Sequence, residues 1–185
     1  LWFHVDAAYG GFFQLTQRGA VALRGIERAD TITLDPHKGL FLPYGTGAAL
    51  VREGQQLLDA FSASADYIKP FFETDVGPSP ADLSPELTRH FRAMRLWLPL
   101  QIAGIAAFRA AQSEKLALAR YFHARLSELR SWDAGPSPDL SVVAFRYLPK
   151  SGDVDDYNER LIRHVQDEGR VMLSGTRIDG RYYLR

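Results

Sequence analysis

The sequence predicts an α/β fold with a mainly parallel sheet in residues 1–110, followed by a small α+β domain in residues 111–185. Residues 1–5 and 31–34 are short apolar runs typical of buried strands, and residues 19–29 favour a short helix between them. A strand, a helix and a strand within about 35 residues form a βαβ unit with parallel strands.

The remaining elements follow from local patterns. Residues 47–51 predict a third strand after the glycine-containing turn 42–47, and residues 70–85, with four prolines, predict an exposed loop. Ser84 and Pro85 resemble the N-cap and first position of a helix. This helix has one apolar stripe formed by Leu87, Phe91, Met94, Leu98, Ile102 and Ile105. Pro99 is expected to kink or break it.

The sequence of the C-terminal domain predicts, in order, a helix, a strand, a second helix and two further strands. Leu118, Phe122, Leu126 and Leu129 mark its first helix, and residues 140–148 favour a strand. Asp153 and Gly169 are positioned to cap the second helix at its two ends. The dipeptide Asp179-Gly180 then predicts a hairpin turn between the last two strands.

Composition excludes several classes of function. Lys plus Arg equals Asp plus Glu, 22 each, so no net charge points to nucleic acid or to an anionic membrane. No apolar run reaches the ~18 residues of a membrane span. The chain has no cysteine, which fits a reducing compartment, and we expect a cytoplasmic protein. No His or Asp spacing predicts a metal site. The chain opens and closes on strand-like segments, from which we expect a fragment that lacks its N-terminal half.

Two charged residues follow predicted neighbouring strands. Asp6 comes after the first strand and Lys38 after the second, and ligands of open α/β sheets bind at the carboxyl ends of the strands. A desolvated lysine can attack a carbonyl carbon, and such a Schiff base is how pyridoxal phosphate (PLP) is held. The coenzyme's pyridine nitrogen needs an acid partner, which Asp6 could be. Ala8 could lie against the ring, and His37 could donate to the phosphate.

At these residues the sequence resembles a known family. The segments "HVDAAYGG" and "DPHKG" are similar to the two signature segments of the group II PLP-dependent amino acid decarboxylases, which are fold type I enzymes related to aromatic-L-amino-acid decarboxylase. "SPELTRHFRAMRLWLPLQIAG" resembles the segment after that family's mobile loop. The resemblance implies a PLP-dependent transferase-like large domain, with Lys38 as the Schiff-base lysine and Asp6 as the partner of the pyridine nitrogen.

The same resemblance implies Ala8 beneath the ring, His37 near the phosphate, and a homodimer with its sites at the subunit interface. The expected reaction is loss of the α-carboxylate from an L-amino acid, whose identity the sequence does not give. The family's phosphate-binding loop and ring-stacking histidine lie upstream of Leu1. His90 stands beside Arg89 where a second arginine is common.

The family's mobile loop usually offers a tyrosine as proton donor, whereas the loop here has Phe71 and Phe72, and Tyr67 precedes it. Phenylalanine cannot donate a proton. It therefore stays open whether protonation after decarboxylation is clean, and we expect some aldehyde and ammonia beside the amine.

Other interpretations remain. The chain could belong to another fold type I enzyme, such as an aminotransferase, an aldolase or a desulfurase-like lyase. It could also be a non-catalytic PLP-fold interaction subunit, although Lys38 and Asp6 would then not be needed. Asp35 is interpreted as a turn residue, because a carboxylate would repel a phosphate, and Arg89 as structural or as a loop anchor. The sequence assigns no role to Arg185.

Overall fold

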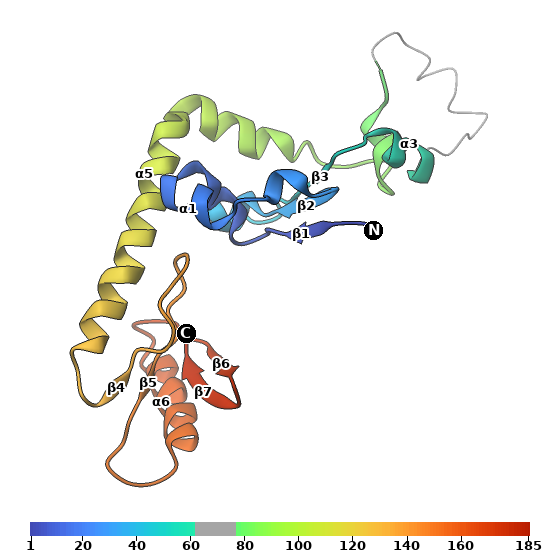
Figure 1. Cartoon of the computed structure of the whole chain (residues 1–185). Helices are drawn as coiled ribbons and strands as arrows, with labels where there is room; N and C mark the ends of the chain where they lie inside the picture. Colours follow the sequence, from blue (N-terminus) through green and yellow to red (C-terminus); the bar gives the residue numbers. More distant parts are fainter. Residues whose placement is uncertain (62–76) are drawn as a thin grey trace. The chain divides into compact units, whose positions relative to one another are not determined.

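The structure, a computed structural model, describes residues 1–61 and 77–185 and divides the chain into two compact units (Figure 1). Unit 1 spans Leu1–Arg109, and unit 2 spans Ala110–Arg185. Helices and strands occur in both units, so the predicted α/β class is confirmed. In the described part of the chain, no helix is both long and apolar enough to cross a membrane.

Unit 1 is built on a three-stranded sheet. Its strands lie in the order β1 (His4–Asp6), β2 (Thr31–Leu34) and β3 (Ala48–Val51). β1 and β2 are parallel, as predicted, but β3 runs antiparallel to β2. The expectation of a mainly parallel sheet is therefore wrong for β3. The connection 35–47 has only a one-turn helix and a turn, and so it does not carry the chain back to the start of the sheet.

Short helices connect β1 to β2. They are η1 (Gly11–Leu15), α1 (Gln17–Ala22) and η2 (Ile26–Arg28). The side chain of Thr16 caps α1 by accepting a hydrogen bond from the backbone N–H of Gly19. Gly25 has a φ of 99°, a left-handed conformation that ends the first helical segment before η2 begins. The single helix predicted over residues 19–29 is thus two shorter ones.

The helices that follow the sheet depart from the predicted boundaries. They are α2 (Pro36–Gly39), α3 (Gln55–Phe61), η3 (Pro80–Leu83) and α5 (Ala93–Ser127). The predicted cap at Ser84 and Pro85 is wrong, because Ser79 and Pro80 begin η3 through a capping box with Asp82. Ser84 instead ends η3 in an extended conformation.

The long helix α5 consists of two helices joined at Gly104. The backbone leaves helical values there, with φ 71° and ψ 157°, and Pro99 lies inside the first helix. The break therefore lies at Gly104, five residues after the predicted position at Pro99. Glycine reaches a positive φ without a Cβ clash, which makes it the easier place to interrupt the helix.

Unit 2 contains two small antiparallel strand pairs, the C-terminal part of α5 and a second helix. Its elements are β4 (Trp132–Asp133), β5 (Arg146–Tyr147), α6 (Val154–Glu168), β6 (Gly175–Ile178) and β7 (Arg181–Leu184). The predicted caps of α6 at Asp153 and Gly169 are confirmed. So is the hairpin turn, where Asp179 and Gly180 both have positive φ. The strand predicted over 140–148 shrinks to β5 and one bridge from Phe145.

The core of unit 2 lies between α5, α6 and the strands. Its buried members are Leu126, Ala134, Phe145, Ile162 and Leu184. Leu184 comes from β7 and bonds through its backbone with Phe145, so the C-terminal hairpin is held to the centre of the unit by hydrogen bonds as well as by packing.

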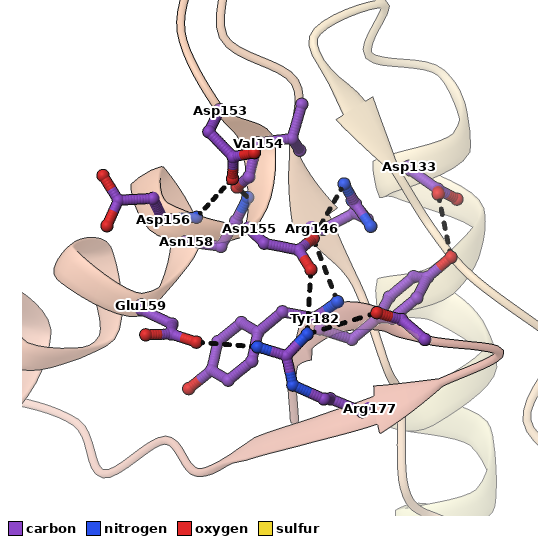
Figure 2. A network of polar contacts seen from close by, with 12 residues as sticks. Asp133, Arg146, Asp153, Val154, Asp155, Asp156, Asn158, Glu159, Arg177 and Tyr182 are labelled. Atoms are coloured by element: carbon purple, nitrogen blue, oxygen red, sulfur yellow. Dashed lines mark hydrogen bonds and ion pairs between the residues drawn. The ribbon is translucent and has the colours of Figure 1, made fainter.

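A polar network on the same unit links α6 to the strands (Figure 2). Asp155 accepts a hydrogen bond from the backbone N–H of Tyr182 and forms ion pairs with Arg146 at 3.2 Å and Arg177 at 3.0 Å. The pKa of Asp155 lies below its usual value, first because of the Tyr182 N–H and further because of the two guanidinium groups. Asp155 therefore carries its negative charge where three backbone segments meet.

Asn158 fixes β5 against α6 from a fully buried position. Its Oδ1 accepts from the backbone N–H of Tyr147 at 2.8 Å, and its Nδ2 donates to the carbonyls of Tyr147 at 2.9 Å and Val154 at 2.7 Å. The Asn158 side chain thus satisfies both the N–H and the C=O of Tyr147. Tyr147 belongs to β5, which pairs with β4 at two residues.

We expect Asn158→Ala to lower the free energy of unfolding by about 2–4 kcal/mol, because it leaves a buried N–H and a buried C=O without partners. Urea denaturation followed by circular dichroism measures the change. Asp156→Ala is the matched control, since Asp156 lies on α6 with an exposed side chain and should cost less than about 0.5 kcal/mol. Equal effects of the two substitutions would contradict the assigned role of Asn158.

Candidate active site

The parallel pairing of β1 and β2 brings the two predicted site residues to one edge of the sheet. Asp6 is the last residue of β1 and pairs in register with Thr33 of β2. Lys38 follows β2 on the one-turn helix α2. Asp6 and Lys38 each influence the charge state of the other, so the two strand ends share one electrostatic environment.

Two hydrogen bonds hold the Asp6 carboxylate. Its Oδ1 accepts from the backbone N–H of Ala8 at 3.1 Å and from the Thr33 hydroxyl at 3.2 Å. The pKa of Asp6 lies below its usual value, chiefly because of the Ala8 N–H and then the Thr33 hydroxyl. Within the described residues, no hydrogen bond reaches Oδ2. Asp6 therefore presents an ionised carboxylate with one oxygen available to a ligand.

Lys38 lies beside a second carboxylate. Its Nζ is 2.7 Å from Oδ2 of Asp35, three residues earlier. The pKa of Lys38 is raised above its usual value, first by the hydrogen bond to Asp35, with smaller contributions from the charges of Asp35 and Asp6. Asp35 was interpreted from the sequence as a turn residue, and the structure adds this ion pair.

His37 is anchored on the other side of Asp35. Its Nδ1 donates to the backbone carbonyl of Thr46 at 2.6 Å, and its ring lies 4.7 Å from that of Tyr44. Its Nε2 is 3.9 Å from Oδ2 of Asp35. The His37 ring is thus held in place with Nε2 on the side of the two charged groups, and its contact with a phosphate stays a prediction.

Ala8 lies in the turn after β1, because the strand ends at Asp6. The alternation of strand side chains therefore no longer applies at Ala8, and contact of its methyl group with a ring stays a prediction. Its backbone has an observed role: the N–H binds Asp6, and the carbonyl accepts from the N–H of Asp35 at 3.1 Å. Ala8 thus connects the two strand ends.

Sequence reasoning missed two threonines of this site. Thr33 faces Asp6 across the strand pair, and Thr46 holds both the N–H and the ring of His37 through its backbone carbonyl. Register between parallel strands would have indicated Thr33, once Asp6 was chosen. No pattern in the sequence indicates Thr46, because it acts through its backbone carbonyl, which every residue type has.

The other candidates lie elsewhere or outside the described residues. Arg89 donates to the backbone carbonyls of Pro80 and Glu86, as expected of a structural residue. Arg185 binds the hydroxyl of Ser174 through its Nε. The predictions for Tyr67, Phe71 and Phe72 fall on residues that the structure does not describe. Among those that it does describe, no cluster of His, Asp or Glu could hold a metal.

Comparison with known proteins decides the family. The pyridoxal-dependent decarboxylase conserved domain matches residues 1–148. The chain belongs to the pyridoxal-dependent decarboxylase family. The family that the two signature segments predicted is confirmed, and the cofactor of this family is pyridoxal phosphate.

Relatives and solved structures agree. The chain is 36% identical to the aromatic-L-amino-acid decarboxylase of Bacillus atrophaeus and 30% identical to tyrosine decarboxylase 2 of Arabidopsis thaliana. It aligns over its whole length but spans 40% and 35% of these two relatives. The crystal structure of Catharanthus roseus tryptophan decarboxylase with L-tryptophan matches 99% of the chain and 38% of its own length, with 28% identity and a TM-score of 0.87.

The side chains at this edge fit the coenzyme of the family. An ionised carboxylate with an available oxygen suits a protonated pyridine nitrogen, and Asp6 provides it. A primary amine suits the coenzyme aldehyde, and Lys38 provides it at the end of the neighbouring strand. The Asp35 carboxylate is the one group here that suits the coenzyme poorly, because it repels a phosphate.

The Phe12 side chain packs closely on the backbone of α2 at Gly39, next to Lys38. A Cβ added to Gly39 would meet the ring of Phe12 at 2.8 Å. Phe12 belongs to η1, directly after the Asp6 turn. The glycine therefore permits α2 to approach the Phe12 side chain of η1.

We expect Gly39→Ala to destabilise the protein by about 1–3 kcal/mol, because the methyl group overpacks against Phe12. Thermal unfolding of Gly39→Ala, Phe12→Ala and the double variant measures the coupling between the two positions. The double variant should recover part of the loss caused by Gly39→Ala, because the truncation removes the ring of Phe12 but leaves its Cβ, 2.9 Å from the added methyl group. Additive losses would show that the contact does not constrain Gly39.

Proposed function

We propose that the full-length protein is a carboxy-lyase that removes the α-carboxylate of an L-amino acid as carbon dioxide, with pyridoxal phosphate bound at Lys38. The observation that carries the proposal is the placement of an ionised Asp6 and the Lys38 amine at one edge of a parallel strand pair, in a chain of this family. Lys38 would hold the coenzyme covalently, Asp6 would bind its pyridine nitrogen, Ala8 would lie beneath its ring, and His37 would lie near its phosphate.

The chain's own residues explain how the site would act. Pyridoxal phosphate supplies an electron sink for the pair left on Cα when carbon dioxide departs. Asp6, already ionised through Ala8 and Thr33, keeps a proton on the pyridine nitrogen. Lys38, once its Nζ is released by the substrate amine, holds a proton that it can return to Cα.

We further propose an aromatic L-amino acid as the substrate class. The names of the relatives support this, since they include an aromatic-L-amino-acid decarboxylase and a tyrosine decarboxylase at 36% and 30% identity. Incubation with tyrosine, tryptophan and glutamate, followed by product analysis, separates the possibilities. Amine with one equivalent of carbon dioxide supports a decarboxylase, whereas keto acid would indicate an aminotransferase.

The remaining proposals concern the whole assembly. Residues 1–110 would form part of the coenzyme-binding large domain and residues 111–185 most of the small C-terminal domain of a cytoplasmic homodimer. The resemblance to the family supports this arrangement. So do the exposed apolar side chains before and within the first half of α5, which need a covering surface: Leu87, Phe91, Trp97 and Ile102.

Lys38 should carry the coenzyme. Borohydride reduction of the loaded protein, digestion and mass spectrometry should find the pyridoxyl group on Lys38, because its amine lies at the Asp6 strand edge. The Lys38→Ala variant is the control and should give no labelled peptide. A label on Lys69 or Lys150 would refute the assignment.

Asp6→Asn should lower kcat by about a hundredfold while the coenzyme remains bound, because a neutral amide cannot hold the pyridine nitrogen protonated in the transition state. Steady-state kinetics together with the absorbance of bound coenzyme separates the two effects. Asp59→Asn is the control, since Asp59 is an exposed aspartate of α3 that accepts a hydrogen bond from Gln55. Unchanged turnover in Asp6→Asn would assign Asp6 another role.

A further inference from the structure

Asp35 occupies a helix-capping position without capping the helix. It is the N-cap residue of α2, yet its side chain accepts no hydrogen bond from the first turn. Aspartate at this position usually accepts from the backbone N–H two or three residues on. Here Oδ2 of Asp35 instead binds Nζ of Lys38 at 2.7 Å. The carboxylate is therefore directed at the reactive amine and not at the backbone.

The backbone of Asp35 already performs the structural work of this turn. Its carbonyl accepts from the N–H groups of Lys38 at 2.9 Å and Gly39 at 3.0 Å, and its N–H donates to Ala8. Pro36 adds a fixed φ at the first helical position. Since main-chain groups close the turn, the carboxylate can be replaced without removing what holds α2 in shape.

The charges around the pair act in one direction on Lys38. Asp35 and Asp6 are the carboxylates that face it, Tyr44 contributes with the same sign, and the ring of His37 lies near Asp35. Asp35, Asp6 and Tyr44 favour the charged form of the Lys38 amine, with Asp35 the largest contributor, and partial burial opposes them. At neutral pH the amine is therefore an ammonium ion, which has no lone pair with which to attack a carbonyl.

We propose that Asp35 is a positioning residue that holds Lys38 as an ammonium ion and thereby sets the pH at which Lys38 takes up the coenzyme, an inference that rests on the proposed function. Uptake requires the ammonium to give a proton to solvent. The neutral Nζ then bonds to the aldehyde carbon, and the aldehyde oxygen leaves as water. Asp35 stabilises the charged amine from which this reaction must start.

The sign of the effect follows from the charge. Removing the Asp35 carboxylate lowers the pKa of Lys38, so the neutral fraction of the amine rises at any pH below that pKa. A partly exposed ion pair of this kind changes such an equilibrium by about two- to fivefold. Asp35→Asn should therefore take up the coenzyme about two- to fivefold faster at pH 7.5, with its pH midpoint moved downward.

A second cause must be separated, because Asp35 would also repel the coenzyme's phosphate. Pyridoxal lacks the phosphate, so it reports the effect on Lys38 alone. The full-length apoprotein is mixed with pyridoxal phosphate or with pyridoxal between pH 6.5 and 9.5. The rate is followed by absorbance of the C=N bond, and the modified residue is identified after borohydride reduction. We expect Asp35→Asn to show the faster rate and the lower midpoint with both compounds.

Two further variants at Asp35 allow the test to be made even if Asp35→Asn does not fold. Asp35→Ser supplies a second neutral side chain of a type common at N-cap positions. Asp35→Glu retains the charge and should return the midpoint toward that of the unmodified protein. Asp59→Asn is the control for loss of a remote carboxylate. An unchanged midpoint in the folded neutral variants, or a change with pyridoxal phosphate alone, overturns the role of Asp35. Failure of the unmodified protein to label Lys38 overturns the proposed function itself.

Discussion

The hydrogen-bonded register between β1 and β2 is the constraint on which the candidate site depends. Parallel pairing places the carboxyl ends of both strands at one edge, and the register sets Asp6 opposite Thr33. From that register follow the hydroxyl that binds Asp6 and the exit of β2 toward Asp35 and Lys38. A shift by one residue would turn Asp6 to the opposite face of the sheet.

Main-chain contacts hold the candidate site. Ala8 joins the two strand ends through its N–H and its carbonyl, and Thr46 holds His37 through a backbone oxygen. Backbone groups cannot rotate away as side chains do, so the carboxylate of Asp6 and the ring of His37 have little freedom. The Lys38 side chain is more exposed than that of His37 and can move, as expected of a residue that changes its covalent partner.

In unit 2, buried polar side chains connect the helix α6 to the strands. Arg146 is nearly buried, and in the part of the chain described here its Nε and Nη1 have no hydrogen-bond partner. Its charge is compensated by Asp155 and by the face of the Tyr183 ring. Together with Asn158, this arrangement fixes α6 to the short strands where few backbone hydrogen bonds could do so.

The sequence by itself determined the family, because "HVDAAYGG" and "DPHKG" carry local chemistry at a fixed spacing, and it determined both ends of α6 and the last hairpin, whose caps and turn act within a few residues. The tertiary structure alone decided the direction of β3 and the pairing of Lys38 with Asp35. These depend on which groups meet in space. A residue pattern records what each position tolerates, whereas a contact also depends on the path of the chain between its partners.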